Sequence, residues 1–150
     1  MKRFTGHLLI GLTVVLAGCS TYSDDDLSTF DVKIKNHLEK EDIKCERSES
    51  GLYFNILEEG EGDYIQFQDR VSFTYTGTLL DGAIFDNQQE PVEFAVADLI
   101  GAWKEIMLQI KKGAKVYLAT PPQLAYGSNA LDDIPANSVL IYEMDILDVK

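Results

Sequence analysis

The stretch from Val71 to Gly82 constrains the fold more than any other part of this 150-residue sequence. Aliphatic or aromatic side chains alternate with small hydroxyl side chains from Val71 to Thr76, which is the period-two pattern of a half-buried β-strand. The Asp81-Gly82 pair follows, and Asp-Gly is typical of the tight turn in a β-hairpin. Residues 83–85 begin an apolar return. The sequence therefore predicts an antiparallel hairpin.

One helix and several further strands are expected around this hairpin. Apolar residues at helical spacing between Asp98 and Lys112 predict a helix, with Asp98 as its N-cap and Gly113 just beyond its end. Other extended segments are predicted at residues 52–57, 91–96, 114–119 and 139–149. This order favours a single α+β domain, in which a mostly antiparallel sheet covers one short helix.

A second, amphipathic helix is predicted near the N-terminus, from about residue 27 to residue 43. Its apolar positions, which recur near helical spacing, are Phe30, Ile34, Leu38 and Ile43. The helix either packs on the domain or mediates self-association. Residues 20–28 before it are polar and read as a tether. Their acidic run, residues 24–26, also resembles a surface-export signal of some lipoproteins.

The first 18 residues have the features of a bacterial lipoprotein signal peptide. A short basic start precedes an apolar, uncharged run at residues 4–18, which is too short to span a bilayer as a helix. The run ends in LAGC, and this motif resembles the lipobox, whose cysteine is lipidated. We therefore expect a lipid anchor on Cys19 and a place in the bacterial cell envelope, at the outer membrane, on its periplasmic or surface face. The alternative is an ordinary secretory signal that is cut near Ala17-Gly18.

Charge and cysteine content exclude some partners and bonds. The formal net charge is −12 at pH 7, which argues against nucleic acid as a partner because phosphates repel an acidic surface. The two cysteines are Cys19 and Cys45. If Cys19 carries a lipid, Cys45 cannot form an internal disulfide, and we expect a structural or idle thiol there.

The sequence offers little for nucleophilic, metal or nucleotide chemistry. Only His37 remains as a histidine after the expected cleavage site, and H-E-x-x-H, C-x-x-C, G-x-S-x-G and Walker motifs are absent. We therefore expect no cofactor and no metal. Aromatic residues instead gather at the ends of expected elements, where they form either a plain core or a binding pocket. These residues are Tyr75, Phe85, Phe94, Trp103, Tyr126 and Tyr142.

Five motifs in the same order resemble the FKBP-type peptidyl-prolyl isomerases. They are YTGTLLDG at 75–82, FD at 85–86, LIGAW at 99–103, PPQLAYG at 121–127 and IPANSVL at 134–140. The resemblance runs from about Leu52 to Lys150. It implies an isomerase domain at residues 48–150, preceded by a tether and helix at 19–47. It also implies an antiparallel sheet of about five strands wrapped around one short helix, with the pocket between them.

The resemblance assigns site residues position by position. Those in catalytic positions are Tyr75, Phe85, Asp86, Ile100, Trp103 and Tyr126, and those in further substrate-binding positions are Val92, Leu99, Ile134 and Tyr142. Trp103 would form the floor that accepts the proline ring. The Ile100 N–H and the Tyr126 hydroxyl would donate to substrate carbonyls. Asp86 would make a polar contact with substrate or with Tyr75.

The implied function is prolyl isomerisation that assists the folding of exported, proline-containing polypeptides. The chain departs from the family pattern at Ala102, where glycine is usual, at Ala136, where a second proline is common, and at Tyr142, where phenylalanine is usual. The segment after Asp86 is also shorter than in many relatives. These departures keep a non-catalytic binding module or chaperone as the alternative, and they leave macrolide binding open.

Overall fold

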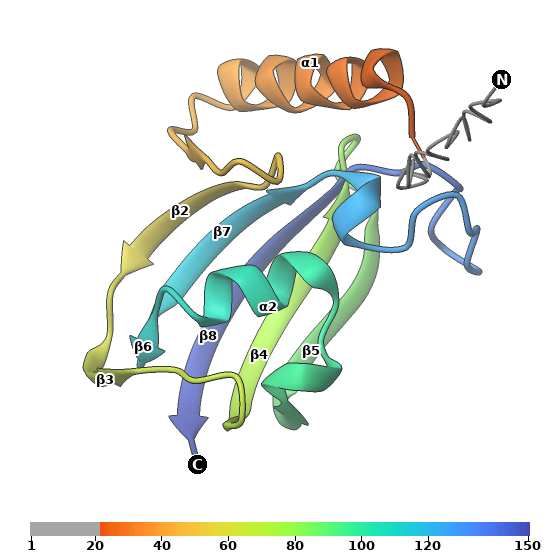
Figure 1. Cartoon of the computed structure of the whole chain (residues 1–150). Helices are drawn as coiled ribbons and strands as arrows, with labels where there is room; N and C mark the ends of the chain where they lie inside the picture. Colours follow the sequence, from red (N-terminus) through yellow and green to blue (C-terminus); the bar gives the residue numbers. More distant parts are fainter. Residues whose placement is uncertain (1–21) are drawn as a thin grey trace, which may run out of the picture.

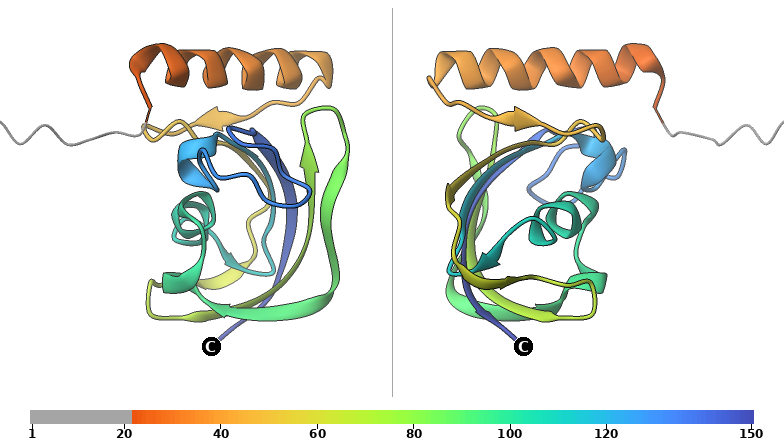
Figure 2. Two further views of the ribbon diagram at one scale, coloured as in Figure 1. Left: turned by 90° about the vertical axis from the view of Figure 1, so that its right-hand side faces the viewer. Right: turned by 60° about the vertical axis from the view of Figure 1, so that its left-hand side comes forward.

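The chain forms a strongly bent sheet with one short helix on its inner side and a longer helix across its upper end (Figures 1 and 2). The computed structural model describes residues 22–150, so the expected signal peptide at 1–18 and Cys19 lie outside the described residues. The arrangement confirms the expected class, an antiparallel sheet wrapped around one short helix, with an N-terminal helical extension.

The main sheet is antiparallel throughout, in the strand order β1-β2-β7-β8-β4-β5. Its strands are β1 (Glu46–Arg47), β2 (Tyr53–Glu58), β4 (Arg70–Leu79), β5 (Ile84–Ala95), β7 (Lys115–Thr120) and β8 (Leu140–Val149). A small second sheet pairs β3 (Glu61–Tyr64) with β6 (Lys111–Lys112). The 3₁₀ turns are η1 (Val96–Asp98) and η2 (Pro122–Leu124).

The hairpin predicted from the alternating stretch is confirmed as β4 and β5. Gly82 occupies its turn at φ 89°, a left-handed conformation that glycine adopts without steric cost. The Asp81 carboxylate accepts a hydrogen bond from the Ala83 N–H at 3.0 Å and closes the turn. The sequence indicated two separate extended pieces after the turn, whereas β5 is one strand. Two register shifts against β4 let β5 continue through its polar middle.

The central helix α2 (Gly101–Met107) is shorter than the sequence predicted. The predicted bounds of this helix, Asp98 to residue 112, were wrong, because Asp98 lies in η1 and Ile100 is the N-cap. Gly113 follows the strand β6 and not a helix. Ile110 is still buried beyond the end of α2. A compact turn can therefore continue an apolar stripe, so the stripe alone does not fix where a helix ends.

The N-terminal helix α1 (Asp24–Lys40) begins earlier than predicted. Ser23 is its N-cap, and its hydroxyl accepts from the Asp26 N–H at 3.2 Å. The Asp26 carboxylate accepts in turn from the Ser23 N–H at 3.0 Å, which completes a capping box. Acidic side chains in the first turn also favour the positive end of the helix dipole. Residues 24–28, which we expected to be part of a tether, thus belong to the helix.

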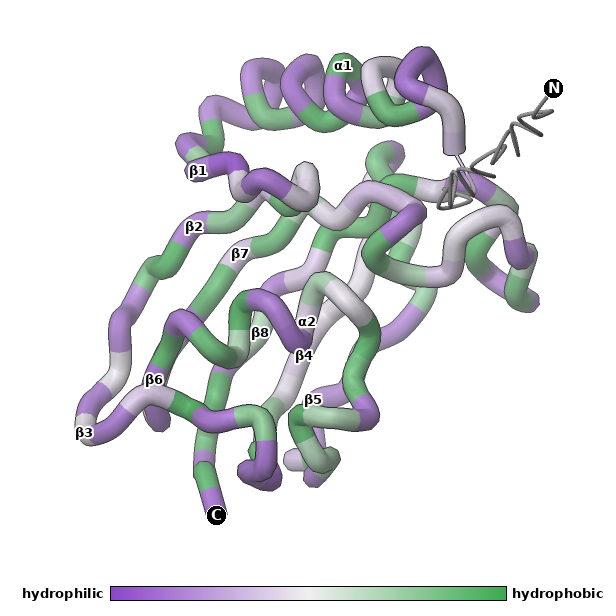
Figure 3. The backbone as a smooth tube through the Cα atoms, in the orientation of Figure 1, coloured by the Kyte–Doolittle hydropathy of each residue, from purple (hydrophilic) through white to green (hydrophobic). Residues whose placement is uncertain are grey.

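Two hydrophobic clusters lie on opposite faces of the main sheet, because successive strand residues point to opposite sides. The inner core lies between α2 and the concave face, and its buried members include Leu52, Phe73, Trp103, Ile106 and Tyr142. The outer cluster lies beneath α1, whose apolar segments mostly face the sheet (Figure 3). The outer cluster consists of Tyr22, Phe30, Ile34, Leu38, Tyr53, Tyr117, Ala119, Val139 and Ile141. Of the two roles expected for α1, packing on the domain is therefore observed.

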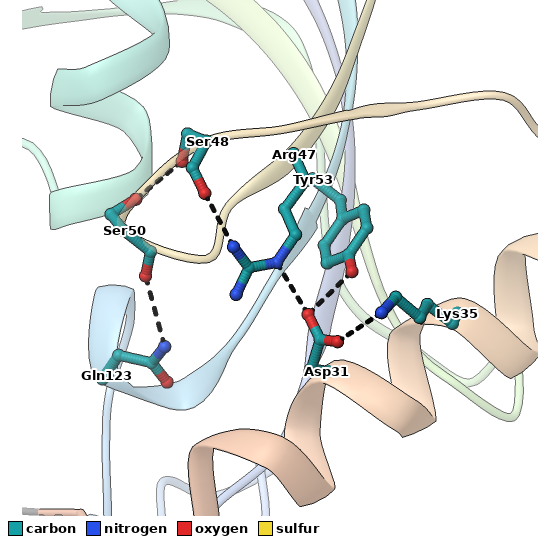
Figure 4. Close-up of polar contacts among 7 residues, drawn as sticks. All are labelled: Asp31, Lys35, Arg47, Ser48, Ser50, Tyr53 and Gln123. Carbon is teal, nitrogen blue, oxygen red and sulfur yellow. Dashed lines mark hydrogen bonds and ion pairs between the residues drawn. The ribbon is translucent and has the colours of Figure 1, made fainter. Parts of the chain in front are cut away.

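Asp31 ties α1 to the segment that leads into β2 (Figure 4). Its carboxylate accepts hydrogen bonds from Arg47 Nε and from the Tyr53 hydroxyl, both at 2.7 Å, and pairs with Lys35 at 2.7 Å. Burial raises the pKa of Asp31, but these three donors outweigh burial and hold the pKa at about 2. The carboxylate is therefore ionised at neutral pH, and α1 is held by charge as well as by apolar contact.

Two side chains that could have been reactive occupy structural positions beside the outer cluster. Cys45 is a free cysteine, and burial raises the pKa of its thiol to about 11. At neutral pH the thiol is therefore protonated and a poor nucleophile, as expected of an idle thiol. His37 lies 3.1 Å from the Tyr117 hydroxyl through its Nε2 atom, so it joins α1 to β7.

Candidate active site

The indole of Trp103 lies at the centre of the inner core and is held edge-on by three other rings. Its centroid lies 4.9 Å from that of Tyr75, 5.0 Å from that of Tyr142 and 5.4 Å from that of Phe73. Such perpendicular arrangements are favourable because the positive edge of one ring meets the negative face of another. Only 8% of Trp103 is exposed. The indole therefore sits at the bottom of an aromatic cluster, and only a small part of it reaches the surface.

Phe85 forms one side of this cluster, and Gly77 makes room for it. The Phe85 ring lies perpendicular to the Tyr142 ring at a centroid distance of 5.7 Å. A Cβ atom on Gly77 would lie 2.5 Å from the Phe85 ring, so only glycine lets the ring lie against β4. Gly77 was quoted in a motif, but its role was missed. Glycine inside a strand, which often marks a close approach, was the available signal.

Asp86 lies at the rim, and Tyr75 is its partner as expected. The Tyr75 hydroxyl donates to Asp86 Oδ2 at 2.5 Å. Both side chains are placed by the hairpin, since Gly77 pairs with Asp86 across β4 and β5. Burial and the Asp86 carboxylate together raise the pKa of Tyr75, so the phenol stays protonated and keeps donating. The exposed carboxylate thus fixes the orientation of a ring that packs on Trp103.

Two buried polar atoms of the inner core are poorly satisfied. Trp103 Nε1 is shielded from solvent and has no hydrogen-bond partner within residues 22–150. The Tyr142 hydroxyl is also shielded and makes no hydrogen bond of ordinary geometry, and the Tyr126 phenol is its polar neighbour. Burial, followed by Tyr126, raises the pKa of Tyr142. Buried polar atoms are nearly always paired in folded proteins, so these two atoms mark a part of the core that is not optimised for stability alone.

The remaining site residues expected from the sequence gather in or against the same core. Those that are partly buried against it are Val92, Ile100 and Tyr126, and those that are buried are Leu99 and Ile134. Val92 lies opposite Phe73 on neighbouring strands. The structure therefore brings the ten expected pocket positions together. Partly exposed residues form the rim, and buried residues form the base.

Two of the three departures from the family pattern can be placed in this structure. Ala102 is fully buried in α2, so its extra methyl group is accommodated within the inner core. Tyr142 takes the place of a phenylalanine and adds the buried hydroxyl described above. Ala136 is exposed in the loop before β8, and nothing in the structure explains the departure there.

The chemistry available to this site is apolar binding with a few hydrogen bonds. Asp86 is hydrogen-bonded to the cluster, and its observed partner is the Tyr75 phenol. In the part of the chain that the structure describes, no three His, Cys, Asp or Glu side chains are placed to hold a metal ion. In that same part, no helix is long and apolar enough to cross a membrane.

Comparison with known proteins identifies the family of this chain. The family model described as FKBP-type peptidyl-prolyl cis-trans isomerase matches residues 62–147, a range that includes every pocket residue discussed above. The chain belongs to this family.

Particular relatives and structures are similar over most of this chain. The FKBP-type peptidyl-prolyl cis-trans isomerase FkpA of Escherichia coli K12 is 37% identical over 132 residues, which are 85% of this chain and 49% of the relative. A probable FKBP-type isomerase of Haemophilus influenzae is 39% identical over 113 residues, or 73% of this chain and 46% of the relative. The chain thus spans about half the length of these relatives.

Two solved structures are similar to this chain over most of its length. The crystal structure of FkpA from Escherichia coli has a TM-score of 0.73 at 37% identity, and the match covers 84% of this chain and 62% of that chain. A peptidyl-prolyl cis-trans isomerase from Pseudomonas syringae has a TM-score of 0.73 at 26% identity, with 89% and 99% coverage.

Proposed function

We propose that this protein is a peptidyl-prolyl cis-trans isomerase that assists the folding of proline-containing polypeptides in the bacterial cell envelope. The observation that carries the proposal is the aromatic cluster in which perpendicular rings surround the indole of Trp103, with Asp86 hydrogen-bonded to the Tyr75 ring of that cluster. Membership of the isomerase family supports the same reaction.

The reaction needs no nucleophile, because no bond to carbon is made or broken. Rotation about an X-Pro bond faces a barrier of about 18–20 kcal/mol, and uncatalysed exchange takes tens to hundreds of seconds. The twisted amide has lost resonance and part of its polarity. A site made of Trp103, Phe85 and Tyr142 with little water favours this twisted state over the planar one, which is differential binding of the transition state.

Two donors would orient the substrate over the indole. The Tyr126 side chain packs against the inner core at its rim. The Ile100 N–H lies at the N-cap of α2, and N–H groups at this position have no partner within a helix. Each hydrogen bond to a substrate carbonyl contributes about 0.5–1.5 kcal/mol. Weak binding of this kind suits a site that accepts exposed prolines in many polypeptides.

The cell-envelope part of the proposal is supported by the sequence LAGC at residues 16–19, which resembles a lipobox. Mass spectrometry of the protein from bacterial membranes tests it. A mature N-terminus at Cys19 carrying acyl chains is expected, and Cys19→Ala should release the protein from the membrane. A mature chain that begins elsewhere and has no lipid contradicts the anchor and leaves the isomerase proposal intact.

Isomerase activity is tested with a protease-coupled assay on a proline tetrapeptide. We expect activity in the unaltered protein, and a loss of at least several-fold with Phe85→Ala or Asp86→Ala, while circular dichroism shows a retained fold. Ile84→Ala is the matched control, because Ile84 precedes Phe85 on the same strand but is largely exposed. If the unaltered protein gives the rate of the uncatalysed reaction, the proposed isomerase activity is contradicted.

A non-catalytic binding module is the second candidate, and the low exposure of Trp103 favours it. An indole that is only 8% exposed must become more accessible before a proline ring can stack on it. This candidate predicts a defined protein partner without acceleration of prolyl exchange. The same tetrapeptide assay therefore separates the two functions.

A further inference from the structure

Tyr22, the first residue that the structure describes, packs against the domain, although the sequence placed it in a tether. Its buried ring lies perpendicular to the Phe30 ring of α1 at a centroid distance of 5.1 Å. Its hydroxyl donates to Asn137 Oδ1 at 2.7 Å. Figure 1 shows the start of α1 beside the loop that contains Asn137, at the upper right. Tyr22 therefore joins the N-terminal segment to the loop between η2 and β8.

This loop, residues 125–139, carries two of the residues expected in the prolyl site. Tyr126 and Ile134 lie in it, and both pack against the inner core that contains Trp103. Over these residues the backbone pairs only at the isolated bridge between Leu131 and Ile134 and forms no helix or longer strand. The shape of the loop therefore depends on its hydrogen bonds and on side chains that contact it from outside.

Asn137 closes the loop. Its N–H donates to the Gly127 backbone oxygen at 2.9 Å. Its φ is 61°, a left-handed conformation that asparagine adopts more readily than most residues but that is still unfavourable. A residue keeps such a conformation where its surroundings hold it. The hydrogen bond from Tyr22 is one such contact, so it helps to keep the loop closed.

The Tyr22 hydroxyl also lies next to the backbone that fixes Tyr126. A Cβ atom on Gly127 would lie 3.7 Å from the Tyr22 hydroxyl oxygen, and Gly127 directly follows Tyr126. Tyr22 and Tyr126 line the same cavity of about 540 Å³. Burial, followed by the Asp26 carboxylate, raises the pKa of Tyr22, so the phenol stays protonated and keeps donating.

We propose that Tyr22 is a positioning residue for prolyl isomerisation, because its hydrogen bond to Asn137 holds the loop that places the Tyr126 hydroxyl for the substrate carbonyl. This role rests on the proposed isomerase function. It adds to that function a residue from outside the isomerase domain expected at residues 48–150. Tyr22 does not touch the substrate in this role and acts through Asn137 and Tyr126.

The first test measures kcat/KM of the full chain on a proline tetrapeptide, with and without Tyr22→Phe. Phenylalanine keeps the ring against Phe30 and removes only the hydroxyl. We expect kcat/KM to fall about two- to tenfold, mainly through a higher KM, which is the range that one hydrogen bond corresponds to. Tyr53→Phe is the matched control. It removes another hydrogen-bonded hydroxyl of the outer cluster, far from the loop in sequence, and should leave kcat/KM unchanged.

Two further measurements separate positioning from a general loss of stability. In a Tyr126→Phe background the positioned hydroxyl is gone, so adding Tyr22→Phe should lower kcat/KM little further. Equal falls in both backgrounds would overturn the route through Tyr126. Hydrogen exchange at the Asn137 N–H, which bonds to Gly127, should become faster in Tyr22→Phe and stay the same in Tyr53→Phe.

The outcomes separate this role from the proposed function. If the unaltered protein is active and Tyr22→Phe leaves its kcat/KM unchanged, the positioning role is overturned and the isomerase function stands. An unaltered protein that is inactive on the tetrapeptide overturns the isomerase function and the role with it. If Tyr22→Phe does not fold, as judged by circular dichroism, Asn137→Gly decides the question. Glycine removes the acceptor and adopts the same φ without strain.

Discussion

The two faces of the main sheet differ in whether the polar atoms of their aromatic side chains have hydrogen-bond partners. Beneath α1, each tyrosine of the outer cluster has a partner. The Tyr22 hydroxyl donates to Asn137, the Tyr53 hydroxyl donates to Asp31, and the Tyr117 hydroxyl lies 3.1 Å from His37 Nε2. On the concave face, Trp103 Nε1 has none among residues 22–150, and the Tyr142 hydroxyl has only the Tyr126 phenol as a neighbour, without ordinary hydrogen-bond geometry.

This difference separates a face whose polar atoms are paired from the face that carries the proposed prolyl site. Fully paired polar atoms are the usual state of a protein interior, and α1 completes that state on the outer face. Poorly satisfied polar atoms on the inner face lower stability. If the proposed site is right, changes beneath α1, other than at Tyr22, alter stability without altering catalysis, whereas changes at the partly exposed residues around Trp103 alter catalysis.

The largest stability effect is expected from Ile34→Ala in the outer cluster. Ile34 is fully buried, so the change leaves a cavity between α1 and the sheet and should cost about 2–5 kcal/mol of unfolding free energy. Urea denaturation measures this loss. The isomerase rate per folded molecule should stay the same. A lower isomerase rate per folded molecule in Ile34→Ala would show that the two faces are coupled and would contradict the predicted independence of the two faces.

The next effect is expected from Asp31→Asn, and it depends on pH. The change weakens hydrogen bonds to a carboxylate and should cost about 1–3 kcal/mol at pH 7. The pKa of Asp31 is about 2 in the folded chain, below the value near 3.9 of an unfolded one. The stability from its charge is therefore fully present above about pH 4 and is lost as pH falls through about 2. Urea titrations should show the difference from the unaltered protein shrinking over this range, and a difference independent of pH would contradict the role of the charge.

The smallest effect, and the sharpest comparison, comes from removing one hydroxyl on each face. Tyr53→Phe breaks the hydrogen bond to Asp31 and should cost about 0.5–1.5 kcal/mol. Tyr142→Phe removes a buried hydroxyl that makes no hydrogen bond of ordinary geometry, so stability should stay level or rise slightly. Thermal unfolding under identical conditions measures both variants. Equal losses would mean that the Tyr142 hydroxyl is paired in solution.

The sequence predicted the hairpin, the antiparallel class and the grouping of the aromatic residues. The family resemblance gave the contact between Tyr75 and Asp86 as one of two alternatives. The sequence analysis missed what depends on distances across the fold, since Gly77 matters only because Phe85 lies against it. The predicted length of α2 was wrong, since buried residues continue beyond Met107 in a turn that is not helical.

The edge strand β5 has features that hinder its pairing with strands of other chains. A strand with one free edge can template the addition of a foreign strand, which leads to aggregation. Among residues 22–150, β5 has β4 as its neighbour on one side and no strand on the other. It carries Glu90, Pro91 and Glu93, and its pairing with β4 is interrupted twice. Proline, charge and irregular pairing all discourage such addition. If the protein binds unfolded polypeptides as proposed, this edge lets it stay monomeric beside chains that would otherwise pair with it.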